Sequence, residues 1–263
     1  MVDSAATLIF KTTDGSVSAV ELLNKGYELP AHRHDDAQLM LVVRGLVTCE
    51  VASGLWIVPP QCALWIPVGM EHSMRGIGDL QLYCVYVAPT LAAPLPRDCC
   101  TLTVSPLLRE IVIEISHLPH HYDINGPNRR LIGTMLDRLA IAPVEQLHLP
   151  MPSDGRLRQI AERLVADPSD RTTVPEWARK VGMSERTLFR LLSKETGMSF
   201  RRWRQQFQIM LALKRLSEGD SVQAVAFDLG YESSSAFVTM FRKTLGKPPL
   251  KFLAERSHGT ARS

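Results

Sequence analysis

The sequence has few cysteines and no long apolar run. Its five cysteines are an odd number without the paired spacing of zinc-binding thiols, so we expect reduced and mostly buried thiols. No apolar stretch approaches the roughly 20 residues that a membrane span needs. The stretch Met1 to Thr13 lacks the basic start and apolar run of a secretory signal. These absences predict a soluble, intracellular protein without membrane partners.

Basic residues are scarce in the first half of the chain and abundant in the second. From residue 151 onward there are 20 Lys and Arg against 12 Asp and Glu, a net charge of +8, whereas residues 1–150 carry 10 against 15, a net charge of −5. A chain of 263 residues is long enough for two domains that each bury a core. The basic half is therefore the candidate for contact with a polyanion such as nucleic acid.

The stretch Val222 to Phe252 has the pattern of two short helices joined by a tight turn. Apolar residues recur at three- and four-residue spacing and stop at Gly230, a residue type that commonly follows the end of a helix. Ser233 suits an N-cap, and Gly246 would end the second helix. The inward positions of that helix would be Ala236, Phe237, Met240 and Phe241. Two short helices joined in this way form a helix-turn-helix unit.

The same pattern occurs earlier in the chain. Ser184, Leu188, Leu192 and Gly197 lie 49 residues before Ser233, Phe237, Phe241 and Gly246. Between the copies, apolar residues from Phe200 onward keep helical spacing over roughly 19 residues, which predicts a rod of roughly 28 Å. This length is close to the roughly 34 Å turn of B-DNA, so two units on one rod would enter successive major-groove segments.

The second copy also carries a longer recognisable signature. It extends from Gly230 to Phe237, through Phe241, Arg242, Lys243 and Gly246, to Pro248, Pro249 and Phe252. This signature resembles that of the AraC/XylS transcriptional regulators, over about the last hundred residues. The resemblance implies a bacterial, cytoplasmic homodimer that binds double-stranded promoter or operator DNA, responds to a small-molecule or metal effector, and contacts RNA polymerase.

Residues 7–90 have the composition of short strands. The candidate strands are Leu39 to Val43, Leu46 to Val51, Leu64 to Ile66 and Leu80 to Val87. Gly, Pro, Asp and Ser clusters separate them, and many short strands at close spacing favour a sandwich or barrel.

Two groups of residues within this region resemble the motifs of cupin barrels. The first consists of Gly26, His32, Arg33, His34, Gln38 and Gly45, and the second of Pro67, Gly69 and His72. Gln38 replaces the usual Glu, Gln61 stands where the second motif usually opens with Gly, and Gly76 where it usually closes with Asn. The predicted fold is therefore α+β and multidomain: a cupin-like β-barrel (jelly roll) with a helical hairpin, then an all-α domain with two helix-turn-helix units.

The histidines of these motifs form a candidate site with Gln38. His32 and His34 are two residues apart and would share one face of a strand, Gln38 keeps that face if the strand is uninterrupted, and His72 would come from a second, facing strand. Three imidazoles and an amide oxygen suit a divalent ion such as Zn, Fe, Ni or Mn. The alternative is that the same side chains line a pocket for an organic effector.

Residues 97–152 connect the two parts. Two apolar stripes predict a helical hairpin, from Ser105 or Pro106 to Leu118 and from Pro127 to Ile141, joined by a loop from His120 to Gly126. The stripes would pack on the barrel or on a second copy, and the family resemblance favours dimerisation. Residues 142–155 are predicted as an extended linker. The expected domains are thus 1–96, 97–152 and 153–263.

The two helix-turn-helix units offer different side chains to DNA. The exposed positions predicted are Arg186, Phe189 and Arg190 in the first unit, and Ser234, Ser235, Val238 and Thr239 in the second. Arginine can donate two hydrogen bonds to guanine, whereas the small side chains suit thymine-methyl and phosphate contacts. Arg201, Arg242 and Lys243 are predicted to contact phosphates.

These observations favour a ligand-controlled, sequence-specific transcription regulator without catalytic residues. The alternative is a metal-dependent cupin enzyme, such as a dioxygenase or isomerase, with a helical appendage. The loss of the acidic ligand at Gln38 argues against the enzyme.

Overall fold

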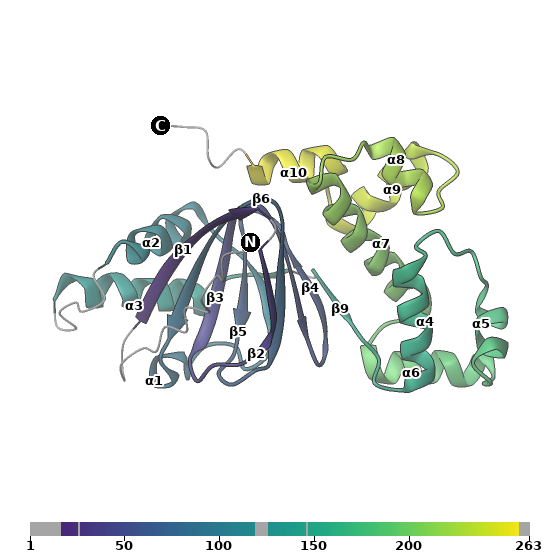
Figure 1. Ribbon diagram of the computed structural model, residues 1–263, viewed down its shortest axis with the longest axis horizontal. Coiled ribbons are helices and arrows are strands. Elements are labelled where there is room, and N and C mark those ends of the chain that lie inside the picture. Colours follow the sequence, from purple (N-terminus) through teal and green to yellow (C-terminus); the bar gives the residue numbers. More distant parts are fainter. Residues whose placement is uncertain (1–16, 26, 119–125, 146, 258–263) are drawn as a thin grey trace, which may run out of the picture.

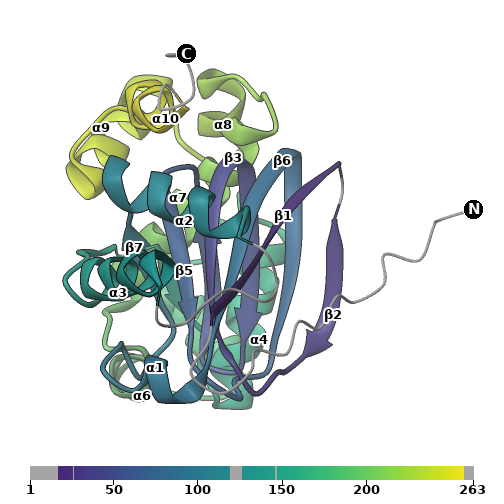
Figure 2. The same cartoon turned by 90° about the vertical axis from the view of Figure 1, so that its left-hand side faces the viewer.

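The computed structural model describes residues 17–25, 27–118, 126–145 and 147–257. A curled antiparallel sheet occupies the middle of the molecule, a helical hairpin covers one side of it, and a second helical domain lies on the other side (Figure 1). Figure 2 shows the hairpin lying across the sheet when that side faces the viewer. None of the helices in these ranges is both long and apolar enough to cross a membrane.

Within the described ranges, the sheet contains nine strands. They are β1 (Val17–Lys25), β2 (Glu28–His32), β3 (Ala37–Val51), β4 (Gly54–Val58), β5 (Cys62–Ile66), β6 (His72–Val87), β7 (Cys100–Thr103), β8 (Val144–Glu145) and β9 (His148–Pro150). The main path runs β1-β6-β3-β5-β7-β8, with β2 paired to β6, and β4 paired to β3 and β9. The predicted cupin-like N-terminal domain built from β-strands is confirmed, and the structure shows that its strands pair antiparallel.

Side chains on successive residues of a strand point to opposite faces, and the sheet buries both of its faces. Met40, Leu64 and Ile66 belong to a core that continues into the second helical domain. Leu39 and Trp65, on the opposite face, belong to a core shared with the hairpin. Burial on both faces explains why these strands lack a clean polar alternation.

Two strands that the sequence predicted as separate form one continuous strand in the structure. β3 covers both Leu39–Val43 and Leu46–Val51, with irregular pairing to β6 around Arg44. Gly45 lies between them with a φ of +76°, and a Cβ there would come within 2.8 Å of the Ile77 carbonyl oxygen. Only glycine combines this left-handed conformation with so close an approach.

The segment predicted as an extended linker contains two short strands of the sheet in the structure. Residues 142–155 include β8, which pairs with β7, and β9, which pairs with β4. The sheet therefore continues well beyond residue 96, where the sequence pattern placed the end of the barrel. Segments as short as β8 and β9 have no periodicity of their own, so they could not be recognised from the sequence.

The hairpin is formed by α2 (Pro106–Ser116) and α3 (Pro127–Ala140), close to the predicted bounds, and α1 (Pro89–Ala92) precedes it. The hydroxyl of Ser105 caps α2 by accepting from the backbone N–H of Leu108. The buried stripe, which packs on the barrel, consists of Leu108, Ile111, Val112, Ile115, Ile132, Met135 and Leu139. Leu107, also in α2, is outside this stripe and 50% exposed. Residues 119–125, most of the predicted loop, lie outside the described ranges, as does Gly26.

The second helical domain contains seven helices within the described residues. They are α4 (Gly155–Ala166), α5 (Val174–Lys180), α6 (Glu185–Thr196), α7 (Phe200–Ser217), α8 (Val222–Asp228), α9 (Ser234–Leu245) and α10 (Pro249–Ser257). Pairs α5/α6 and α8/α9 are the two predicted helix-turn-helix units, and α7 is the predicted rod. Ser184 and Ser233 cap α6 and α9 as expected. Helix α10 was not predicted.

The two domains meet along α7 and β9. The indole Nε1 of Trp203 donates to the carbonyl oxygen of Pro150 at 2.7 Å. The Glu195 carboxylate, near the end of α6, accepts from the backbone N–H groups of Ser153 and Asp154 at 2.7 and 3.1 Å. The segment that leaves the barrel is thus tied to the first helix-turn-helix unit immediately after β9.

Candidate functional site

Helix α6 presents its predicted side chains to solvent. Arg186 and Arg190 are exposed, and Phe189 is 44% exposed. The opposite side of the helix is buried through Leu188 and Leu192. This arrangement is that of a recognition helix, with long donors near its N-terminal end.

Helix α9 presents much smaller side chains. Ser235 and Thr239 are exposed, whereas Ser234 and Val238 are half-buried, and Val238 packs against the core. The prediction that all four are exposed is therefore wrong for Ser234 and Val238. Ala236, which was predicted to face inward, is exposed, so Phe237 and Phe241 form the fully buried side of α9.

The three basic side chains predicted to contact phosphates are exposed: Arg201 at the start of α7, and Arg242 and Lys243 near the end of α9. Arg204, one turn after Arg201, instead donates to the carbonyl oxygen of Asp170. That contact ties α7 to the segment that precedes α5.

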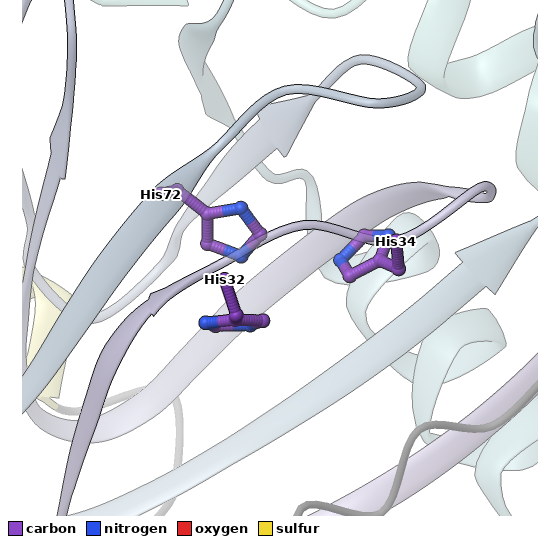
Figure 3. Close-up of side chains that lie close together, drawn as sticks. All are labelled: His32, His34 and His72. Atoms are coloured by element: carbon purple, nitrogen blue, oxygen red, sulfur yellow. The ribbon is translucent and has the colours of Figure 1, made fainter.

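In the barrel, the three histidines come together with Gln38, as Figure 3 shows for the histidines. His32 ends β2, His34 lies in the loop after β2, and His72 begins β6. The strand is thus interrupted between His32 and Gln38, and His72 lies on the strand next to β2, directly paired with His32, rather than on a facing one. These two details of the prediction are wrong, yet the predicted convergence is present.

The ring centroid of His72 lies 4.3 Å from that of His32 and 5.2 Å from that of His34. One potential ligand atom from each histidine lies within 4.8 Å of the other two. Nε2 of His34 is 3.2 Å from Oε1 of Gln38, whose amide nitrogen donates to the Tyr86 hydroxyl at 3.3 Å. No pattern in the sequence indicated that Tyr86, rather than another barrel aromatic, would reach this cluster.

Burial determines the charge of His72. His72 is 2% exposed, and its removal from water lowers the pKa of its imidazole to about 4. Nδ1 of His72 lies 3.0 Å from the Met70 carbonyl oxygen, while its buried Nε2 has no hydrogen-bond partner among the described residues. A neutral imidazole with a free, buried lone pair is the form in which histidine binds metals.

A groove lies between the barrel and α7, with a volume of about 380 Å³. Its apolar lining comes from both domains: Leu29, Leu55, Ile57 and Met74 from the barrel, and Phe207, Met210 and Leu211 from α7. Its charged groups are Lys214, Glu50 and the ion pair between Arg75 and Glu28, which are 2.9 Å apart. The sequence alone could not reveal this groove because its two walls come from segments more than a hundred residues apart.

Family models match both parts of the chain. A model described as the AraC-like ligand binding domain matches residues 15–149, and a helix-turn-helix domain model matches residues 177–255. The chain belongs to the AraC family of transcriptional regulators. The first model falls on the barrel and its hairpin, and the second falls on the helical domain with the two helix-turn-helix units.

The HTH-type transcriptional regulator NimR of Escherichia coli (strain K12) is 43% identical over 225 residues, which cover 86% of this chain and 82% of NimR. RipA of Corynebacterium glutamicum, also an HTH-type transcriptional regulator, is 35% identical over 103 residues, 39% of this chain and 31% of RipA. Among solved structures, ToxT from Vibrio cholerae matches 90% of this chain and 94% of that chain with 13% identity and a TM-score of 0.38.

Proposed function

We propose that this AraC-family regulator recognises its operator mainly through α6, while α9 positions the protein on the duplex. The observation that carries the proposal is the difference between the exposed faces of the two helices. Arg186 and Arg190 can each donate two hydrogen bonds to one guanine, whereas Ser235 and Thr239 are too short for such contacts. Arg201, Arg242 and Lys243 would hold the phosphate backbone.

Base substitutions in the operator test this division of roles. We expect substitutions under α6 to weaken binding more than substitutions under α9. Ser235→Ala and Thr239→Ala should each change sequence preference less than Arg186→Ala. The binding sites themselves would come from genome-wide mapping followed by footprinting with the purified protein. If positions under α9 prove the more costly ones, the proposed assignment is wrong.

The groove between the barrel and α7 supports control by a small organic molecule with an apolar body. A ligand there would contact both domains at once, so its binding would change how the barrel holds α7. Leu211→Trp would fill the groove, and we expect it to abolish the effect of an effector on DNA affinity while specific DNA binding persists. An effector response that survives this substitution would place the ligand elsewhere.

The hairpin supports self-association. Leu107, Ile141 and Val144 are 50%, 70% and 64% exposed, and all three belong to the hairpin or the short strand after it. A homodimer through this region would place two DNA-binding domains on one operator, in a cytoplasmic protein that also contacts RNA polymerase. The alternative of a cupin enzyme predicts turnover of a small substrate without specific DNA binding.

A further inference from the structure

The three histidines of the barrel share one hydrogen-bonding feature that a chance cluster would not need. Each Nδ1 faces a backbone carbonyl oxygen two residues away along the chain. The distances are 2.9 Å from His32 to Pro30, 2.6 Å from His34 to Asp36 and 3.0 Å from His72 to Met70. A carbonyl oxygen only accepts, so each Nδ1 carries the proton, and in a neutral ring the lone pair is then on Nε2.

Carbonyl groups that hold Nδ1–H in this way orient the imidazole ligands of metal sites. In His72 the lone pair is buried at a position with no donor near it among the described residues. Leaving a buried acceptor without a partner costs stability, and a bound cation would satisfy it.

Gln38 adds a fourth donor. Its Oε1 lies 3.2 Å from Nε2 of His34, while its amide nitrogen is directed at the Tyr86 hydroxyl. Oε1 and a neutral Nε2 are both acceptors, so nothing holds them together directly. A cation bound by both atoms would turn this unfavourable pair into two ligands.

We propose that His32, His34 and His72, through Nε2, and Gln38, through its amide oxygen, bind one divalent transition-metal ion of the Zn, Fe, Ni or Mn class. The inference rests on the proposed function in that it names a ligand of the sensor domain. All four donors are neutral, so the site lacks the carboxylate that would balance the charge of the ion, and affinity should rise when one is introduced.

The metal site also lies next to the domain junction. A second, smaller cavity of about 250 Å³ is lined by His72 and its two neighbours on the chain, and also by Met151 and Arg158. Met151 follows β9, and Arg158 belongs to the first turn of α4. Metal binding would fix the paired ends of β2 and β6 and would thereby stabilise the wall that faces α4.

The experiment uses two samples of the untagged full-length protein. One is purified without chelator, and the other is stripped of metal and then reconstituted with Zn, Fe, Ni or Mn. Elemental analysis should find about one ion per chain, and binding should raise the melting temperature. His34→Ala and His72→Ala should lose the ion, whereas His117→Ala, at an exposed histidine outside the cluster, should keep it. Gln38→Glu should bind the ion more tightly than the wild type.

Cobalt substitution of the wild-type protein gives a second readout, because the visible absorption bands of the bound ion report nitrogen and oxygen ligation directly. This measurement needs no variant, so it holds even where a variant fails to fold. Metal content near zero after reconstitution with all four ions, or equal content in His72→Ala and wild type, would overturn the inference. Operator binding is measured on the same samples. If the protein holds no metal but binds its operator and responds to an organic effector, the metal site is refuted and the proposed function stands. If the protein holds the metal but does not bind DNA specifically, the proposed function is refuted and the metal site stands.

Discussion

Arg190 is the residue on which the proposed DNA recognition depends most directly, because it is exposed on the face of α6 opposite the buried Leu188 and Leu192. We expect Arg190→Ala to lower specific affinity by about 1–3 kcal/mol and to relax sequence preference at one operator position, since a bidentate contact to guanine is lost. Gel-shift titrations against operator and random DNA measure both effects. Arg130→Ala, on the hairpin helix α3, is the control for loss of one positive charge. An equal loss on both DNAs would make Arg190 a phosphate contact.

At the same scale, the histidine cluster shows what the sequence can and cannot predict. The spacing of His32, His34 and Gln38 predicted that their side chains converge, and they do. The prediction assumed one uninterrupted strand, which is incorrect. Strand β2 ends at His32, and the approach of His34 to Gln38 depends on the loop between β2 and β3. The direct pairing of His32 with His72 is a long-range register, which local periodicity does not contain.

At the scale of single elements, replacing two glycines by alanine should change the free energy of unfolding in opposite directions. Gly45 in β3 has a φ of +76° and carbonyl oxygens within 3.1 Å of a built Cβ, whereas Gly133 in α3 has open space around it. We expect Gly45→Ala to lower the free energy of unfolding by more than about 1 kcal/mol, because it adds backbone strain and a clash. Gly133→Ala should raise it by about 0.5–1 kcal/mol, because alanine favours helix. Urea denaturation measures both, and a similar loss in the two variants would contradict this account.

Helices were easier to predict than strands for a physical reason. Caps such as Ser105, Ser184 and Ser233 and the breaks at Gly197 and Gly246 act within one turn, so the sequence alone placed most helices of the second domain to within a residue or two. Strands β7, β8 and β9 are four residues or fewer, and each is a strand only because a distant partner pairs with it. The extended linker predicted from prolines is therefore part of the sheet.

At the scale of the molecule, the barrel and the DNA-binding domain share one continuous core, and β9 belongs to the sheet while it also contacts α7. A ligand in the groove, or a metal next to the junction, would act on this shared boundary. Because Glu195 near the end of α6 accepts from the backbone that follows β9, we expect a change at this boundary to reach α6.

Two tryptophans of the DNA-binding domain allow this coupling to be tested with matched substitutions. Both are nearly fully buried, but Nε1 of Trp203 donates to Pro150, whereas Nε1 of Trp177 has no partner among the described residues. Trp203→Phe and Trp177→Phe remove the same atoms, and only the first leaves the Pro150 carbonyl oxygen of the other domain unsatisfied. We therefore expect Trp203→Phe to cost about 1–3 kcal/mol more in the free energy of unfolding than Trp177→Phe.

Scanning calorimetry should show the consequence for the whole molecule. Because the lost hydrogen bond joins the two domains, Trp203→Phe should separate the unfolding of the barrel from that of the helical domain, whereas Trp177→Phe should shift the helical domain without separating them. The effector response should weaken in Trp203→Phe while operator affinity without effector stays close to that of Trp177→Phe. Identical thermograms for the two variants would mean that the domains are coupled through the apolar core alone, and not through the bond between α7 and β9.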